Sequence, residues 1–514
     1  MPIDRDKARR CAHALVALGG PPAAADLAVV AWLDFLRIDP AHPVDPAGDR
    51  LILGGPGSAD LADALARLVG AAELGAPAGG DGVLGEAVGM AWGARALSRE
   101  GTVCLLAPAA DIFAGAPIQT AAFAVRCRLE NLVVLAMDDG TNDRADEAAE
   151  QLAAAGWFVQ SVAAHDPLQI AAALKRVRGR ERPSLIVGRG ASRAPAAPDG
   201  DGPVPADVMQ IFAERAAEVR EWRRAMGETL AAATAFAAAG EAGGARPRVA
   251  CSPERLAIEI LAADGRIVEC PSLSPREQAP LATGLALLGA TPLLAASVAD
   301  VDHLRPFLRQ VVRAGLSGVL LVRENQDDDG DALWSLRLLR GVTVWRPADG
   351  VEIMAACSAA LERRGLHVLF LAPELSCVLP RPRPAEPGDV ERGAYIAAEA
   401  SAPDPTLVIL SSGKELAGAL VAQARLEAEG VATRVLSVPC VGHLAAWPGT
   451  QIRRLLGSAA RVVLEPGPAL PWRAVLAGDG PIVSAGAPTA TFADNLLAQL
   501  GLAPRRRDLA HAAH

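Results

Sequence analysis

The sequence predicts an α/β protein with three doubly wound domains in series. Three observations lead to this prediction: a length of 514 residues, a hydrophobic fraction of 51%, and short apolar runs that alternate with Ala-rich helical periods. At about 100 to 200 residues per domain, this length suits three domains. Strands that alternate with helices form parallel sheets covered on both faces, and a charged fraction of 21% is too low for a disordered chain.

The first domain is predicted over residues 1–195. Its apolar runs and helical periods predict strands at Val103–Leu106, Leu132–Met137, Trp157–Val162 and Leu185–Val187, and helices at Ala121–Cys127, Ala145–Ala155 and Gln169–Arg176. Residues 196–246 follow. The segment 191–204, rich in Pro, Gly, Asp and Ser, precedes one long helical period, Asp207–Ala239, which the run GEAGGARP closes. This composition predicts a linker that contains a bridging helix.

Two further α/β domains are predicted over residues 247–380 and 381–514, separated by the Pro-rich segment LPRPRPAEPG. In the second domain the apolar runs are at Val249, Ile267, Thr291–Ala295, Val319–Val322 and Val342–Trp345. In the third domain the predicted strands are Leu407–Leu410, Thr433–Val438, Arg461–Leu464 and Pro481–Val483.

Charge and cysteine usage narrow the class of function. Fifty Lys and Arg against 59 Asp and Glu give a net charge of -9, so nucleic acid and membrane are not expected as partners. The eight cysteines form no C-x-x-C pair, which is typical of thiols in a reducing compartment. Residues 1–10 lead into a helix-like stretch rather than a signal sequence, and no apolar run is long enough to cross a bilayer. A cytoplasmic protein is expected.

A series of motifs resembles the transketolase family of thiamine diphosphate enzymes. In chain order these are FLRIDPAHP (35–43), DRLIL (49–53), AVGMAWGARAL (87–97), RLENLVVL (128–135), TGLALLG (283–289), LRPFLRQ (304–310), LRLLRGVTVWRPADGVE (336–352), RGAYI (392–396), LSSGKEL (410–416) and VVLEPG (462–467). The resemblance implies a diphosphate-binding-like domain, a pyrimidine-binding-like domain and a transketolase C-terminal-like domain. It also implies a dimer that binds thiamine diphosphate and Mg²⁺ between subunits and acts on sugar phosphates.

The first domain departs from the family at the cofactor motif. Pro108, Ala109 and Ala110 stand where the family has the Gly-Asp-Gly that holds Mg²⁺ and diphosphate. Asp111 lies close by, and Asp139, followed by Gly140, stands at the family's Asn. These residues are the candidate cofactor-binding set, with Asp139 as the metal ligand, because hard cations prefer oxygen ligands. The alternative is that both acids cap strand-to-helix turns. The family's two substrate-facing histidines are also absent from this domain.

In the second domain, Glu277 of PREQA resembles the family's Glu that activates the aminopyrimidine ring, provided that two residues are deleted before Gly284. The alternative is a solvated first-turn Glu favoured by the helix dipole. His303 stands at a Tyr of the family's aromatic platform, as a proton shuttle or as an exposed or core-edge His.

The sugar-binding motifs are also altered. Glu324 replaces the first His of the family's sugar loop, and the acidic run Asp327–Asp329 is expected to be a solvated turn. Arg453 matches the family's substrate-phosphate Arg, and Arg248 lies one residue out of register with another. A guanidinium suits a phosphate, although both residues are also compatible with plain surface arginines.

Three functions remain open. The first is a non-catalytic homologue, or pseudoenzyme, that acts as a partner subunit or regulator in a homodimer or in a heteromer with a transketolase-like chain. The second is a divergent active enzyme that transfers a two-carbon ketol unit between sugar phosphates. The third is a cofactor-free sugar-phosphate sensor that depends on Arg453. The joint loss of the metal ligand, histidines, aromatic platform and sugar loop favours the first function, because activity depends on the site and not on the fold.

Overall fold

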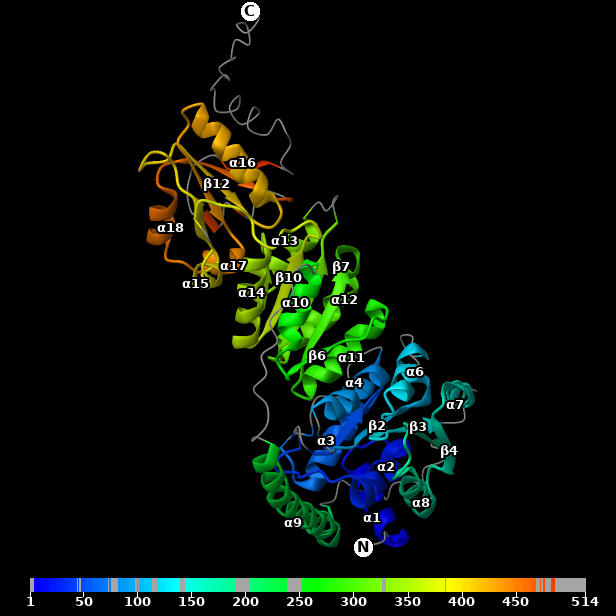
Figure 1. The fold of residues 1–514 in the computed structure, drawn as a ribbon. Helices are drawn as coiled ribbons and strands as arrows, with labels where there is room; N and C mark the ends of the chain where they lie inside the picture. The colour runs from blue at the N-terminus through cyan, green and yellow to red at the C-terminus, as the bar shows by residue number, and fades with distance from the viewer. Residues whose placement is uncertain are drawn as a thin grey trace, which may run out of the picture. The chain divides into compact units, whose positions relative to one another are not determined.

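The computed structural model describes residues 4–43, 45, 48–72, 74, 82–97, 99, 101–112, 118–138, 144–190, 204–237, 252–325, 330–383, 385–467, 472, 475–476 and 482–485 (Figure 1). The chain divides into two compact units. Unit 1 comprises Met1–Ala245 and Cys270–Ala290, and unit 2 comprises Arg246–Glu269 and Thr291–His514. The chain therefore leaves unit 1, returns to it for about twenty residues, and leaves it again.

Unit 1 contains a five-stranded parallel sheet with the strand order β1-β2-β3-β5-β4. The strands are β1 (Arg50–Leu53), β2 (Val103–Pro108), β3 (Leu132–Asp138), β4 (Phe158–Ala163) and β5 (Ser184–Arg189). The central strands β2, β3 and β5 are buried almost throughout, because helices cover both faces of the sheet. The four strands predicted for this domain are confirmed, and β1 lies on the DRLIL motif.

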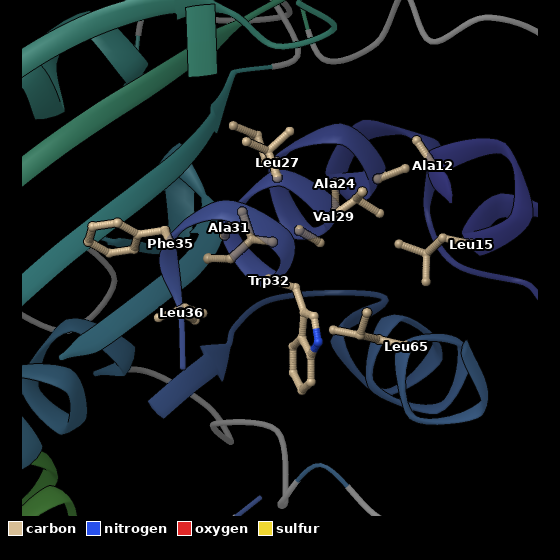
Figure 2. Close-up of a cluster of buried hydrophobic side chains, with 14 of the residues drawn as sticks. Ala12, Leu15, Ala24, Leu27, Val29, Ala31, Trp32, Phe35, Leu36 and Leu65 are labelled. Atoms are coloured by element: carbon tan, nitrogen blue, oxygen red, sulfur yellow. The ribbon is translucent and has the colours of Figure 1, made fainter. Parts of the chain in front are cut away.

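The helices of unit 1 surround this sheet. They are α1 (Arg5–Ala17), α2 (Pro22–Val30), the π-helix η1 (Ala31–Phe35), α3 (Ser58–Val69), α4 (Val83–Ala96), α5 (Ala109–Ile112), α6 (Ile118–Arg126), α7 (Arg144–Ala155), α8 (Pro167–Val177), α9 (Ala206–Ala237) and α11 (Pro275–Leu287). Side chains of the first helices, such as Leu15, Leu27 and Trp32, pack with Leu65 in one buried cluster (Figure 2). The predicted helices near α6, α7, α8 and α9 are confirmed.

Unit 2 contains a second parallel sheet, with the order β6-β7-β8-β10-β9. Its elements are α10 (Pro253–Ala262), β6 (Ile267–Glu269), β7 (Thr291–Ser297), η3 (Val298–Asp300), α12 (Val301–Arg313), β8 (Gly318–Arg323), α13 (Asp331–Arg337), β9 (Val342–Trp345), α14 (Gly350–Glu362) and β10 (Leu366–Leu371). Strands β6, β7, β8 and β9 match predicted apolar runs, whereas no strand was predicted at β10. Val249 lies outside the described residues.

The third sheet also belongs to unit 2 and is mixed, with the order β11-β13-β12-β14-β15. Its elements are α15 (Pro387–Glu391), β11 (Tyr395–Ala398), β12 (Leu407–Ser411), α16 (Glu415–Ala428), β13 (Thr433–Ser437), α17 (Val441–Ala445), α18 (Gly449–Leu456), β14 (Ala460–Leu464) and β15 (Ile482–Ala485). Only β11 runs antiparallel, against β13, among the strand pairs that the structure describes. The predicted α/β fold class is confirmed.

Several predictions concern residues that the structure does not describe. These are the linker residues 191–203, the end of the bridging helix beyond Ala237, and the acidic run 327–329. The four predicted domain ranges stay predictions. In the described part of the chain, no helix combines the length and the apolar character that crossing a membrane requires.

Candidate functional site

The carboxyl ends of β1 and β2 form the edge where open α/β sheets bind ligands. We call Gly54, Gly55, Ala107, Pro108 and Asp111 the β1–β2 edge. Strand β2 ends at Pro108, and helix α5 begins at the next residue, so no loop separates them. Asp111 is half-buried in this short helix.

Side chains fill the β1–β2 edge. Gly55 has a φ of +84°, and a Cβ atom placed on it would overlap Asp111 Oδ2 and lie 2.6 Å from Pro108 Cδ. At Gly54, a Cβ would lie 2.7 Å from Val83 Cγ1 and 3.2 Å from the Ala107 Cβ. Gly55 is therefore needed to let the Asp111 carboxylate and the Pro108 ring approach the backbone after β1, and Gly54 to let Val83 and Ala107 approach it.

The described residues of this edge do not fit a Mg²⁺-diphosphate group. Pro108 has no N–H to donate, and Ala109 has no side-chain oxygen to offer. The one carboxylate, Asp111, faces Gly55 and would repel a diphosphate that arrived without a cation. Asp139 and Gly140, the other members of the predicted set, lie outside the described residues. Within the described ranges, no group of three or more His, Cys, Asp or Glu side chains is arranged to hold a metal ion.

Glu277 occupies the third position of α11 and completes a capping box with Ser274. Its Oε2 accepts hydrogen bonds from the Ser274 hydroxyl at 2.7 Å and from the Ser274 backbone N–H at 3.3 Å. The side chain is 4% exposed, so the expectation of a solvated Glu is wrong, whereas its first-turn position is as expected. The carboxylate satisfies the N-terminus of α11. A catalytic role for Glu277 stays a prediction.

Helix α11 packs directly on α4 in unit 1, where the AVGMAWG and TGLALLG motifs meet. A Cβ on Gly89 would overlap the Leu281 carbonyl oxygen, and a Cβ on Gly284 would overlap the Glu86 carbonyl oxygen. The two helix backbones therefore touch. The glycines in AVGMAWG and TGLALLG are the sequence signal of this contact, because a Cβ at either position would push the helices apart.

The two described candidates of unit 2 lie on different helices. His303 is exposed near the start of α12, in agreement with the expected exposed His. Arg453 is exposed on α18, beside the third sheet. Arg248 lies outside the described residues. The phosphate-binding roles of both arginines, and a proton-shuttle role for His303, stay predictions.

A buried ionic cluster in unit 2 was not predicted. The Arg346 guanidinium, 1% exposed, donates to Glu324 Oε1 at 2.6 Å and to Glu324 Oε2 at 3.0 Å. It also lies 2.6 Å from Glu415 Oε2 and donates to the Ser412 carbonyl at 2.8 Å. Glu324 therefore has a structural partner at the position where the family has a sugar-binding His. Burial raises the pKa of Glu415 despite its proximity to Arg346.

The same cluster continues to Glu465, whose carboxylate accepts hydrogen bonds from Arg337 at 2.7 and 2.8 Å. Burial alone would raise the pKa of Glu465, but Arg337 and Arg346 together bring it below its ordinary value. Three carboxylates thus share two guanidiniums.

A second buried cluster surrounds Glu352 of α14. Its Oε1 accepts hydrogen bonds from Tyr395 Oη at 2.6 Å and from Ser437 Oγ at 2.7 Å, and Arg381 Nη1 lies 3.2 Å away. Arg381 also pairs with Asp349, the N-cap of α14. This network joins α14 of the second sheet to strands β11 and β13 of the third. Both clusters draw on residues far apart in the sequence, so local motifs could not reveal them.

Comparisons with known proteins agree with the fold. Residues 393–487 match the model of the transketolase-like TK C-terminal domain. The chain is 25% identical to the transketolase of Cereibacter sphaeroides over 87% of each chain, and 27% identical to the chromosomal transketolase of Cupriavidus necator over 92% of this chain and 93% of that one. It is 30% identical to the Aquifex aeolicus transketolase over 36% of this chain and 28% of that one.

Solved structures give the same result for the backbone. The transketolase of Campylobacter jejuni matches with a TM-score of 0.74 and 18% identity over 98% of both chains. The transketolase of Leishmania mexicana matches with a TM-score of 0.75 and 16% identity over 98% of this chain and 96% of that one. The chain therefore has a transketolase-family fold.

Proposed function

We propose that this protein is a non-catalytic transketolase homologue, a cytoplasmic pseudoenzyme that acts as a partner subunit or regulator and does not bind thiamine diphosphate. It would work as a homodimer or as a heteromer with a transketolase-like chain. The observation that carries the proposal is the filled β1–β2 edge, where Pro108 and Asp111 lie against Gly55.

The charges at the β1–β2 edge also argue against diphosphate binding. A diphosphate needs either a bridging cation or several N–H donors and positive side chains. The β1–β2 edge instead presents two glycines, one alanine, one proline and one carboxylate.

Calorimetric titration of the full chain with thiamine diphosphate and Mg²⁺ tests the proposal. We expect no heat of binding, with the Cereibacter sphaeroides transketolase as the positive control under the same conditions. Saturable binding at micromolar concentration, dependent on Mg²⁺, would overturn the proposal. Unfolding in urea, recorded on the same preparation, shows that an absent heat comes from a folded protein.

The second candidate function is a divergent active transketolase, favoured by the burial and fixed orientation of Glu277. Its test is ketol transfer from xylulose 5-phosphate to ribose 5-phosphate. If the protein were active, Glu277→Gln would lower the rate by about 10²-fold or more, whereas the exposed Glu269→Gln would not. In the same assay, Arg453→Ala would raise KM for the sugar phosphate, while its exposed neighbour Arg454→Ala serves as the matched control.

A further inference from the structure

A hollow of about 530 Å³ lies at the opposite, amino-terminal edge of the unit 1 sheet. Three of its lining residues immediately precede neighbouring strands: Asp49 before β1, Thr102 before β2 and Asn131 before β3. Its volume falls within the range of about 300 to 1,000 Å³ that is typical of small-molecule sites. The β1–β2 edge is at the other end of the same strands, so the two places are separate.

Four arginines line the hollow, namely Arg37, Arg95, Arg99 and Arg178, and we call it the arginine hollow. Two of them are held by aromatic rings that also line it. The Arg37 guanidinium lies 4.5 Å from the centre of the Trp222 ring, and that of Arg178 lies 5.2 Å from the Phe35 ring. Stacking of this kind orients a guanidinium without neutralising its charge.

Backbone carbonyls hold three of the four arginines, since Arg178 Nη2 also donates to the Phe35 carbonyl oxygen at 3.1 Å. Arg95 Nη1 donates to the Arg128 carbonyl oxygen at 2.7 Å, and Arg99 Nη1 donates to the Leu288 carbonyl oxygen at 2.5 Å. Each of these contacts uses one of the five N–H donors of a guanidinium. Most donors of each arginine therefore remain for a ligand.

The arginine hollow is positively charged. None of its four arginines forms an ion pair within the part of the chain that the structure describes, whereas the nearby Arg223 pairs with Asp39 and Asp45. Of the two carboxylates in the lining, Glu130 is exposed. The other, Asp49, accepts the backbone N–H groups of Arg37 and Thr102 at 2.7 and 2.8 Å.

Asp49 is held in the wall of the hollow by these backbone N–H groups, and its charge also interacts with those of Arg37 and Arg178. Burial raises the pKa of Asp49. Four guanidiniums against two carboxylates leave the lining of this concave space net positive, in a chain whose net charge is -9.

We propose that the arginine hollow binds a phosphorylated small molecule that carries at least two negative charges. Guanidiniums present paired N–H donors that match phosphate oxygens, and several around one hollow can hold more than one anionic group. A purely structural role, in which Arg95 and Arg178 counter the negative C-terminal ends of α4 and α8, is the competing explanation. That role requires no ligand.

Inorganic pyrophosphate is the probe, titrated into the full chain by calorimetry in EDTA at low and at physiological ionic strength. We expect saturable binding that weakens with salt, because the contacts are charged and partly exposed. The double variant Arg37→Gln/Arg178→Gln should raise the Kd at least about tenfold, corresponding to the loss of charge-assisted hydrogen bonds. Arg9→Gln, an exposed arginine of α1, is the matched control and should leave the Kd unchanged.

Absence of pyrophosphate binding, or equal binding by the double variant, would overturn the proposal. Equal affinity for citrate would overturn the assignment to phosphate. Urea unfolding checks that the double variant is folded. If it is not, Arg95→Gln applies the same test, because this side chain is exposed and packs into no core.

The test is independent of the proposed function, although thiamine diphosphate itself contains a diphosphate. Binding of thiamine diphosphate that needs no Mg²⁺ and disappears in Arg37→Gln/Arg178→Gln would belong to the arginine hollow. Binding that requires Mg²⁺ and persists in this variant would instead contradict the non-catalytic function. The pyrophosphate titration alone would then decide whether the arginine hollow binds a phosphorylated ligand.

Discussion

The charged residues with the largest consequences are those buried in unit 2. Arg346 contacts Glu324 and Glu415 in a space from which water is almost excluded, since all three side chains are at most 3% exposed. A charge in such a place is tolerated only with its partners, so removing one partner costs far more than the pair contributes.

Arg346→Met should therefore destabilise the protein by about 3 to 5 kcal/mol, because it leaves Glu324 and its neighbours without a positive partner. The measurement is the free energy of unfolding in urea at pH 7. Arg340→Met, at an exposed position, is the control and should change it by less than about 0.5 kcal/mol. Equal effects of the two substitutions would contradict the prediction.

His367 gives the protein a defined sensitivity to acid. Its Nδ1 accepts a hydrogen bond from Trp345 Nε1 at 3.2 Å, and its Nε2 donates to the Arg363 carbonyl at 3.1 Å, so the folded protein holds the neutral ring. Burial lowers its pKa from 6.5 to about 4. In the unfolded chain the ring takes up a proton near pH 6.5, but in the folded protein only near pH 4.

Protonation therefore favours unfolding, and stability should fall by up to about 3 kcal/mol as the pH drops from 6.5 to 4. His367→Gln removes the titrating group, so its urea midpoint should depend less on pH within this window. His42→Gln is the control, because His42 is exposed. The prediction fails if wild type and His367→Gln lose stability in parallel.

At the residue scale, the sequence predicted where a residue lies along a helix or strand better than it predicted what surrounds the side chain. Glu277 was expected in a first helical turn and is there, but its burial follows from the packing of α11, which no local pattern encodes. The contact of Asp111 with Gly55 depends on how β1 and β2 end side by side, since 56 residues separate the two in the sequence. The role of Arg346 depends on contacts to two segments far from it in the sequence, at Glu324 and at Ser412–Glu415.

At the scale of elements, parallel strands were the easiest to predict. Strands such as β3 and β8 are buried on both faces, so they read as continuous apolar runs. Strand β10 is equally apolar except for His367, which interrupts its run near the start. Strand β11 is short, follows a Pro-rich segment and pairs antiparallel at a bulge, so neither length nor pattern distinguishes it from a loop.

The contact between α4 and α11 predicts that a Gly→Ala substitution in a helix destabilises the protein, where the same substitution usually stabilises it. Gly→Ala within a helix ordinarily stabilises by about 1 kcal/mol. Gly284→Ala should instead destabilise by about 1 to 3 kcal/mol or more, because the new Cβ overlaps the Glu86 carbonyl oxygen. Gly442→Ala in α17 is the control, since nothing lies within 4 Å of its Cβ position. Urea unfolding of both variants is the measurement, and stabilisation by Gly284→Ala would show that the helices do not touch.

At the scale of the whole molecule, the order of motifs predicted the fold, because the same order over most of the length leaves few alternative topologies. The division into units was not foreseen. Helix α11 belongs to unit 1, although the strands on either side of it in the sequence, β6 and β7, belong to unit 2. Each unit is therefore built from two separate stretches of chain.

A fragment of residues 1–246 should consequently be less stable than the same region in the full chain, because it lacks α11 and uncovers the face of α4 around Gly89. A synthetic peptide of residues 270–290 should restore part of the lost thermal stability when added in excess. The same peptide with Gly284→Leu should not. The measurement is the melting temperature with each peptide, and equal effects of the two would contradict the prediction.

Tyr395 offers a separate experimental use. It is the single tyrosine of the chain and is 3% exposed, with its hydroxyl on Glu352. Every tyrosine-specific absorbance change or nitration product of this protein therefore originates at one point. At this point the two sheets of unit 2 are joined. The molecule contains a natural chromophore for watching that junction open, with no label to introduce.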